Sequence, residues 1–195
     1  MPSPIGHVLA GVAAAWTVDL LPGNHVWNAA PTTARGLWAR AGGGLTALCA
    51  GLGAAPDLDL LVGGHRTATH SLTAVALVGV VSAVAAAASA RPALRMAFIC
   101  AAAYGSHLVL DLVAVDQVIP QGIQLLWPFS HRWFITGWNI FPATERKNLL
   151  SAFAIARNAR AGTQEIAIMT PILMALWFAR KRARPATPGW ELKNT

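Results

Sequence analysis

The chain has 195 residues, of which 55% are hydrophobic and 12% are charged, and its mean hydropathy is +0.48. Soluble domains carry about 25% charged residues, so this chain has too few polar side chains to cover a soluble globule, and it is too apolar to be disordered. The composition indicates an integral membrane protein. The net charge of +7 is then expected in cytoplasmic loops and does not indicate binding to nucleic acid.

Five apolar stretches have the character of membrane-spanning helices, which need about 20 mostly apolar residues. They cover residues 5–21, 38–55, 71–90, 96–115 and 163–179. The last stretch reaches the required length if Thr163 caps it and the next two residues form its first turn. We therefore expect an all-α fold, a polytopic membrane bundle of about five spans that forms one domain over residues 1–195.

The segment 121–161 does not read as a clean span. Its first part is irregular and rich in Trp, a residue that favours the membrane interface. Its second part predicts an amphipathic helix that is capped by Thr144 and lies on the membrane surface. The apolar face of that helix would contain Leu149, Leu150, Phe153 and Ala156.

Small residues recur at four-residue spacing in the first two spans. Gly11 and Ala15 lie in the first, and Ala47, Gly51 and Ala55 lie in the second. Such spacing lets two helix backbones approach closely in lipid. An alanine-rich composition explains the same pattern without any contact.

Arginines beside the spans predict the orientation, because Lys and Arg are enriched in cytoplasmic loops. Arg35 and Arg40 lie between the first two spans, Arg91 and Arg95 lie between the third and fourth, and RKRAR follows the fifth. These three regions share one face by alternation. The pattern predicts an outside N-terminus and a cytoplasmic C-terminus, although the long segment after the fourth span places further cations on the opposite face.

Ionisable groups inside membrane segments are costly and by default mark function. Here they occur at the start of the first span, the end of the second, the start of the third and the end of the fourth, and alternation brings all four ends to the same side. A metal-type cluster is therefore predicted at one end of the bundle. Its members are His7, Asp57, Asp59, His65, His70, His107 and Asp111.

The local spacing of these residues suits metal ligation. His107 and Asp111 are separated by one helical turn and share a helix face. The turn at Pro56 brings two carboxylates, Asp57 and Asp59, to the same end, and a carboxylate can bridge two ions. Mixed His and Asp ligation suits Zn, Mn or Fe(II) better than Mg or Ca.

Over roughly residues 2–134 the chain carries five motifs in this order: PSPIGHVLAG, APDLDLL, HRTATHSL, SHLVLD and QLLWPFSHRWF. They resemble those of the YdjM-like inner-membrane, metal-dependent hydrolases, some of which are LexA-regulated. The resemblance implies a metal-dependent hydrolase in the bacterial inner membrane. The ligands that it implies are His7, Asp57, His65, His70, His107 and Asp111, with Asp59 and, more weakly, His131 added.

A more distant likeness is to the all-helical zinc-dependent phospholipase C and nuclease group, which hydrolyses phosphodiesters at a cluster of zinc ions. That group also uses an early His, an Asp, another His and an HxxxD helix motif. This chain has no N-terminal Trp and no second HxxxE or HxxxD after His131. The departures favour one or two ions over a larger cluster.

These features predict hydrolysis by metal-activated water, with zinc as the first expectation and Mn or Fe as alternatives. Asp57 or Asp59 would bridge the ions or act as general base. Arg66 would steady an oxyanion or phosphate, or it is simply a solvated loop cation. The site is predicted at the membrane surface on the periplasmic side. This location suggests membrane lipids as partners and an amphiphilic substrate, such as a phospholipid or an isoprenoid phosphate.

Two other functions fit the same residues. One is a non-enzymatic metal-binding membrane protein, such as a sensor or scaffold. The other is an ion- or proton-coupled transporter, which uses the same residue types. Against a transporter, Asp19 is the one ionisable residue that continues toward the opposite mouth, and it is expected to pair with Arg35 and Arg40. His25 is expected on that opposite face, far from the cluster.

Overall fold

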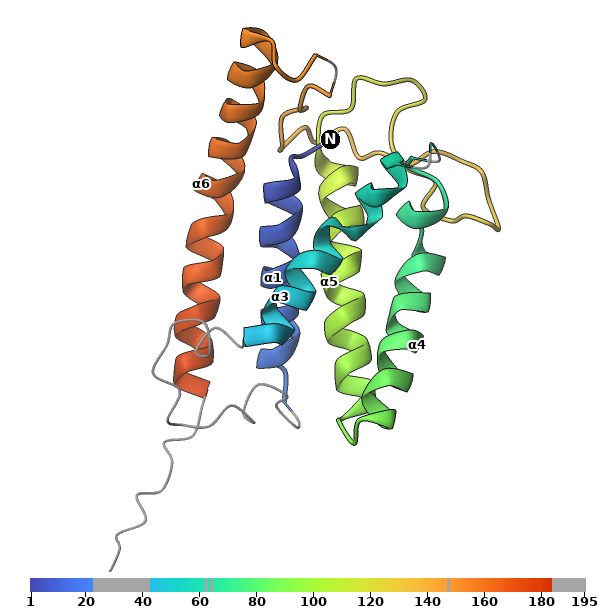
Figure 1. The fold of residues 1–195 in the computed structure, drawn as a ribbon, viewed down its shortest axis with the longest axis vertical. Coiled ribbons are helices and arrows are strands. Elements are labelled where there is room, and N and C mark those ends of the chain that lie inside the picture. Colours follow the sequence, from blue (N-terminus) through green and yellow to red (C-terminus); the bar gives the residue numbers. More distant parts are fainter. Residues whose placement is uncertain (23–42, 62, 64, 147, 184–195) are drawn as a thin grey trace, which may run out of the picture.

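The computed structural model describes residues 1–22, 43–61, 63, 65–146 and 148–183, and in this part of the chain it has helices and no β-strand (Figure 1). The predicted all-α bundle is confirmed. The helices are α1 (Pro4–Leu20), α3 (Gly43–Ala54), α4 (Leu72–Ala88), α5 (Ala93–Val113) and α6 (Ala152–Ala183), with the short 3-10 helices η2 (Ala55–Leu61) and η3 (Ala68–His70).

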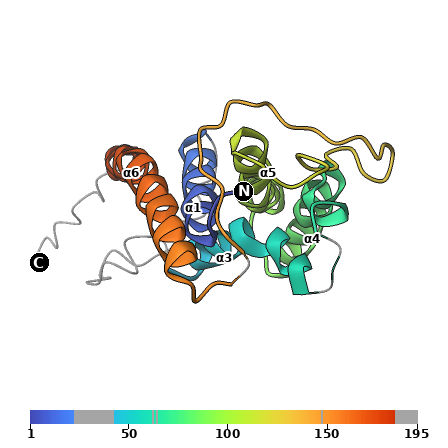
Figure 2. The same cartoon turned by 90° about the horizontal axis from the view of Figure 1, so that it is seen from above.

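The long helices α6, α1, α5 and α4 lie side by side in a row, with α3 on one side of it, as Figures 1 and 2 show. Helix α1 is central, because it packs against α3, α5 and α6, while α4 packs against α5. Successive helices run in opposite directions, so the chain returns repeatedly to the same two ends of the bundle.

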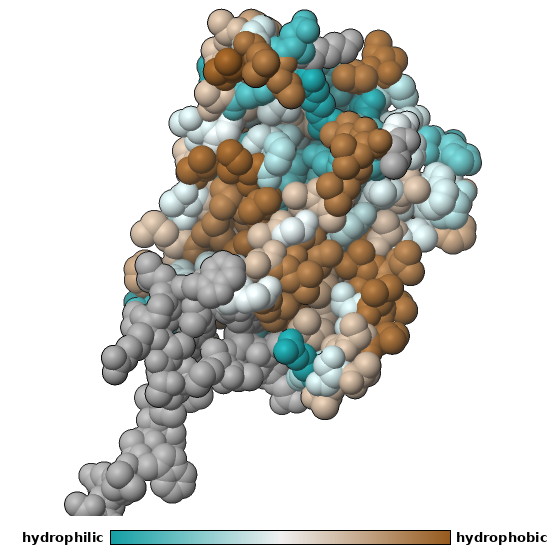
Figure 3. Space-filling model, in the orientation of Figure 1, coloured by the Kyte–Doolittle hydropathy of each residue, from teal (hydrophilic) through white to brown (hydrophobic). Residues whose placement is uncertain are grey.

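The helices are apolar on the outside of the bundle as well as inside. The continuous helical segment Gly43–Leu61, α5 and α6 are each long and apolar enough to cross a membrane, and α1 and α4 are shorter apolar helices of 17 residues. Large hydrophobic side chains such as Leu77 and Val84 of α4 and Phe98 of α5 are exposed. Figure 3 shows a broad hydrophobic belt, with most of the hydrophilic surface near the end where α1 begins. An outward-facing apolar belt is what lipid contact requires.

The structure corrects the two predicted boundaries after residue 121. Ser151 caps α6, because its Oγ accepts a hydrogen bond from Ala154 N at 3.1 Å, and the helix then continues unbroken to Ala183. Part of the predicted surface helix and the fifth span therefore belong to one helix, which runs without a break through Gly162 and Thr163. Thr163 lies within this helix and does not cap one.

Thr144 does not cap a helix either. Its backbone N and its Oγ1 both donate to the carbonyl oxygen of Met1, at 3.2 and 3.1 Å. The irregular segments 114–146 and 148–151 thus fold back over the end of the bundle where α1 begins, and Figure 2 shows them crossing above the helix ends.

Asp19 at the opposite end pairs with the last turns of α6. Its Oδ2 lies 3.3 Å from Nε of Arg180, and the Arg180 guanidinium lies over the ring of Trp16 at 4.7 Å. Arg35 and Arg40, the partners that the sequence predicts, lie outside the described residues, as does His25.

Helices α1 and α3 cross at close range through two glycines. A Cβ atom on Gly53 would lie 2.3 Å from the carbonyl oxygen of His7, and one on Gly11 would lie 2.5 Å from that of Cys49. The predicted role of Gly11 is confirmed. The role predicted for Gly51 is wrong, since a Cβ there meets nothing within 4 Å; Gly53, two residues on, makes the contact.

Replacing Gly53 by Ala is expected to force α1 and α3 apart and to destabilise the bundle by about 1–3 kcal/mol, the usual range for overpacking. The matched control is Gly51→Ala, which adds the same methyl group to the same helix in open space and is expected to be neutral or slightly stabilising. Thermal unfolding of both variants in detergent is the measurement. Equal unfolding midpoints for the two variants would contradict the crossing described here.

Candidate metal centre

Ionisable side chains from separate helices meet at one end of the bundle, as alternation predicts. They come from near the start of α1, from η2, from η3 and the loop before it, and from the last two turns of α5. The structure groups them into three overlapping sets whose ligand-type atoms lie within 4.8 Å of one another. The sets are His7, His107 and Asp111; Asp57, His70 and His107; and Asp59, His65 and His70.

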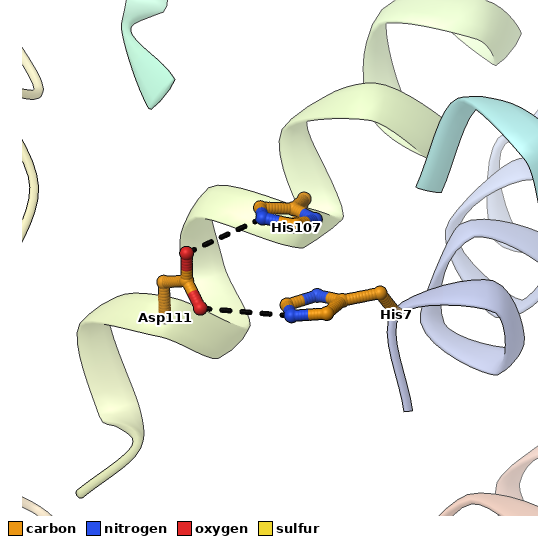
Figure 4. Close-up of side chains that lie close together, drawn as sticks. All are labelled: His7, His107 and Asp111. Atoms are coloured by element: carbon orange, nitrogen blue, oxygen red, sulfur yellow. Dashed lines mark ion pairs between the residues drawn. The ribbon is translucent and has the colours of Figure 1, made fainter. Parts of the chain in front are cut away.

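Asp111 joins two imidazoles in the first set (Figure 4). Its Oδ1 lies 3.6 Å from Nε2 of His7, and its Oδ2 lies 3.3 Å from Nε2 of His107. The two rings stack with their centroids 3.7 Å apart, so each presents one nitrogen to the same carboxylate. His107 and Asp111 are one turn apart on α5, which is the geometry that the HLVLD motif predicts.

His70 and His107 face each other in the second set. Their Nε2 atoms are 3.1 Å apart, and Oδ1 of Asp57 lies 3.7 Å from each of them. Oδ2 of Asp111 lies 3.5 Å from Nε2 of His70. Two imidazole nitrogens and two carboxylate oxygens therefore surround a common point.

The other nitrogen of each ring fixes its tautomer. Nδ1 of His107 lies 2.8 Å from the carbonyl oxygen of Gly53, which can only accept, so Nδ1 carries the proton and Nε2 of the neutral ring has a lone pair. Nδ1 of His70 lies 3.2 Å from Oδ2 of Asp59, and the same reasoning applies. Two lone pairs at this distance repel each other unless a proton or a metal ion lies between them.

The carboxylates around His70 also control its protonation. Burial lowers the pKa of His70, but the neighbouring carboxylates of Asp57 and Asp59 outweigh burial and raise it to about 9. At neutral pH and without metal, His70 then holds a second proton, on the nitrogen that faces His107. Proton and metal ion compete for this nitrogen, as they do at any histidine ligand.

Asp59 differs from Asp57 and Asp111, because both of its carboxylate oxygens already accept hydrogen bonds. Its Oδ1 lies 2.7 Å from Nδ1 of His65, and its Oδ2 accepts from the Thr69 hydroxyl and, at 3.3 Å, from the backbone N of Arg66. Burial lowers the pKa of His65, with the hydrogen bond to Asp59 opposing it, so this ring is neutral. Hydrogen bonds thus account for the third set without an ion.

The first two sets contain buried atoms that lack a hydrogen-bond partner. Within the described part of the chain these are Oδ1 of Asp57, both carboxylate oxygens of Asp111 and both ring nitrogens of His7. Buried charge without a partner is strongly unfavourable, and a divalent cation would compensate it. Imidazole nitrogens combined with carboxylate oxygens suit Zn, Mn or Fe(II). The donor set therefore fits a divalent metal ion.

A buried glutamate that sequence reasoning missed holds the start of α1. Glu165 of α6 has no exposed surface, and its carboxylate accepts from the backbone N of Ser3 at 2.7 Å, from that of Gly6 at 3.0 Å and from the Ser3 hydroxyl. An anion is favoured at a helix N-terminus. A Cβ on Gly6 would lie 2.7 Å from Oε2 of Glu165, so the glycine beside His7 permits this contact. The only sequence signal was a lone acidic residue at the edge of an apolar stretch.

Two residues proposed for the site lie elsewhere. The buried guanidinium of Arg66 pairs with Asp116 through Nη1 and Oδ2, 2.5 Å apart, and lies over the ring of Trp133 at 5.3 Å. His131 is exposed and belongs to none of the three sets. Arg146, which sequence analysis did not propose for the site, places Nη1 2.6 Å from Nε2 of His65.

One comparison with known proteins gives a match. The family model described as YdjM inner membrane protein matches residues 1–184 of the chain. No curated protein and no solved structure matches it.

Replacing Asp111 by Asn is expected to abolish metal binding, because it removes the charge that faces three imidazoles. A metal that binds the folded state stabilises it, so a chelator should lower the unfolding midpoint of the wild type and leave that of Asp111→Asn unchanged. The control is His131→Ala, which should keep both the metal and the chelator effect. Metal content is measured by elemental analysis and stability by thermal unfolding in detergent. A wild type that is indifferent to chelator and free of metal would contradict the metal centre.

Proposed function

The chain belongs to the YdjM inner membrane protein family, and on that premise we propose that it is a multi-pass, metal-dependent hydrolase. The observation that carries the proposal is the set of unpartnered carboxylate oxygens of Asp57 and Asp111 beside the facing Nε2 atoms of His70 and His107. Such a donor set is expensive to bury in an apolar bundle unless it holds a cation.

The ion would be held by the first two sets of the metal centre, which contain the buried atoms without a hydrogen-bond partner. Zinc is the first candidate, with manganese and iron(II) as alternatives, and the donor set would hold one ion or two. When bound, the metal lowers the pKa of a water molecule and polarises the scissile bond. The proposed ligands are His7, Asp57, His70, His107 and Asp111.

The carboxylates divide the remaining roles between them. Asp57 is the acceptor for the proton of the attacking water, because its side chain is 15% exposed while that of Asp111 is fully buried. Asp59 is a positioning residue, since both its oxygens hold His65, His70 and Thr69 in place. The proton that Asp57 takes up passes to the leaving group when the scissile bond breaks.

The surroundings of the cluster favour an amphiphilic substrate and contact with membrane lipids. The segments 114–146 and 148–151, which fold over this end, expose large apolar side chains, including Ile119, Phe129 and Leu150, each at least 89% exposed. Apolar side chains at this level of a membrane protein contact the interface between lipid and water. A lipid-like substrate would reach the cluster beside them.

Hydrolysis is tested with purified, metal-loaded protein against a panel of phosphodiesters, phospholipids and carboxylic esters. Turnover is expected to require metal. Asp57→Asn should reduce kcat by about 10²–10⁴-fold, the usual contribution of a general base, while His131→Ala should leave kcat unchanged. Metal uptake without turnover of any substrate in the panel would favour the sensor or scaffold. Metal-driven uptake of a solute into proteoliposomes, without hydrolysis of any substrate in the panel, would favour the transporter.

We further propose that the cluster faces the periplasm. Arg91, Arg95 and the basic last turn of α6 lie at the other end of the bundle, where cytoplasmic cations are expected. Phe129→Cys places a thiol on a 90% exposed side chain at the cluster end. It should react with a membrane-impermeant maleimide in spheroplasts, whereas the buried Cys49 and Cys100 should give no background. Labelling that appears only after lysis would reverse the orientation.

A further inference from the structure

The cluster is closed on its inner side and open at one edge. The side chains of His7, His70, His107 and Asp111 have no exposed surface, whereas those of His65 and Asp57 keep 16% and 15% of theirs. A substrate that reaches the buried donor atoms therefore passes across Asp57 and His65.

Arg146 lies over this open edge. Its Nη1 is 2.6 Å from Nε2 of His65, and its Nη2 is 3.9 Å from Oδ1 of Asp57. Nδ1 of His65 is a donor to Asp59, so Nε2 has a lone pair and the guanidinium donates to it. The Arg146 side chain is still 34% exposed, so one side of its guanidinium faces an incoming molecule.

The present partners of Arg146 are easily displaced. They are a neutral imidazole nitrogen and the Sδ atom of Met1, 3.6 Å from Nη2, and a thioether is a weak acceptor. Asp57 at 3.9 Å is too far for a hydrogen bond. An oxyanion would offer this guanidinium shorter, charge-assisted bonds.

Arg66, the cation that the sequence suggested for this role, has no such capacity. Its guanidinium donates to Asp116 and to the carbonyl oxygens of Val118 and Gly122, and its residue surface is 7% exposed. Asp116 in turn accepts from the backbone N of Gly122 at 2.7 Å. Arg66 therefore ties the loop before η3 to the segment after α5, and Arg146 is the arginine at the mouth.

We propose that Arg146 binds the anionic phosphoryl group of the substrate at the mouth of the metal cluster, so that the hydrolysed bond is a phosphoester. This inference rests on the proposed function. Carboxylic esters and amides are neutral at the bond that is cleaved, so before reaction a guanidinium binds them less strongly than a phosphoester, which carries negative charge on the reacting group itself. The planar guanidinium can bind two phosphoryl oxygens at once, leaving another to face the buried donor atoms.

The test is the binding of inorganic phosphate to metal-loaded protein in detergent, measured by titration calorimetry at constant ionic strength. Arg146→Ala should weaken phosphate binding about 10- to 100-fold, the range for a charge-assisted hydrogen-bonding group. Arg146→Lys keeps the charge and loses the planar guanidinium, so its affinity for phosphate should lie between that of Arg146→Ala and that of the wild type. Arg132→Ala, an exposed arginine of the same segment, is the matched control and should bind as the wild type does.

Metal content is measured in every variant, so the two levels of the proposal fail separately. A wild type that takes up no metal overturns the proposed function. Metal uptake with phosphate binding that is absent, or equal in the wild type and Arg146→Ala, overturns the role of Arg146 alone. Metal retained in Arg146→Ala together with weakened phosphate binding supports the role and excludes misfolding as the cause.

Competition identifies the source of the phosphoryl group. Displacement of phosphate by phosphatidic acid in nanodiscs, but not by glycerol 3-phosphate, supports a phosphoester within the lipid surface. The reverse order supports a soluble phosphoester. Acetate at the same ionic strength should not compete with phosphate, and competition by acetate as strong as that by either phosphoester would overturn the assignment of a phosphoryl group.

Discussion

The burial of Asp111 is the constraint on which the rest of this structure depends. A carboxylate with no hydrogen-bond partner for either oxygen, on a helix apolar enough to span a membrane, is strongly unfavourable unless positive charge or donor groups compensate it. The chain compensates by directing three imidazoles at it, from α1, η3 and α5 itself. Each imidazole must arrive from a different helix end, and the packing of the bundle is arranged to bring them there.

Backbone contacts and one buried glutamate carry out that arrangement. The crossing of α1 and α3 at Gly11 and Gly53 brings the carbonyl oxygen of Gly53 to the Nδ1 atom of His107, which sets the tautomer of that ring. On the other side of α1, Glu165 binds the first turn of the helix and so fixes the position of His7. The same helix is thus held from two sides by contacts that tolerate no added side-chain atom at Gly6 or Gly53.

The second layer of hydrogen bonds separates carboxylates that look alike in the sequence. Asp57 and Asp59 are two residues apart on η2, yet Asp59 is fully engaged with His65, Thr69 and the backbone of Arg66, while Oδ1 of Asp57 has no hydrogen-bond partner. One orients the imidazoles, and the other is available for a cation or a proton. Partners that orient ligands are a general feature of metal sites, and here they determine which residues are proposed to do chemistry.

The sequence by itself determined the helical class and the end at which the polar residues gather. Both follow from hydropathy and alternation, because a chain that crosses the bundle repeatedly must return the same helix ends to the same side. The HLVLD motif also determined the pairing of His107 with Asp111, since residues four apart share a helix face.

Only the tertiary structure decided which arginine lies at the mouth, where α6 begins and what Glu165 does. Arg66 lies between two candidate ligands in the sequence, but its side chain pairs with Asp116. The guanidinium beside His65 is that of Arg146, which follows His65 by 81 residues. Thr144 and Thr163 have the chemistry of helix caps, yet Ser151 makes the cap, because Thr144 bonds to Met1 instead. These outcomes depend on contacts between segments far apart in the chain, which no local pattern encodes.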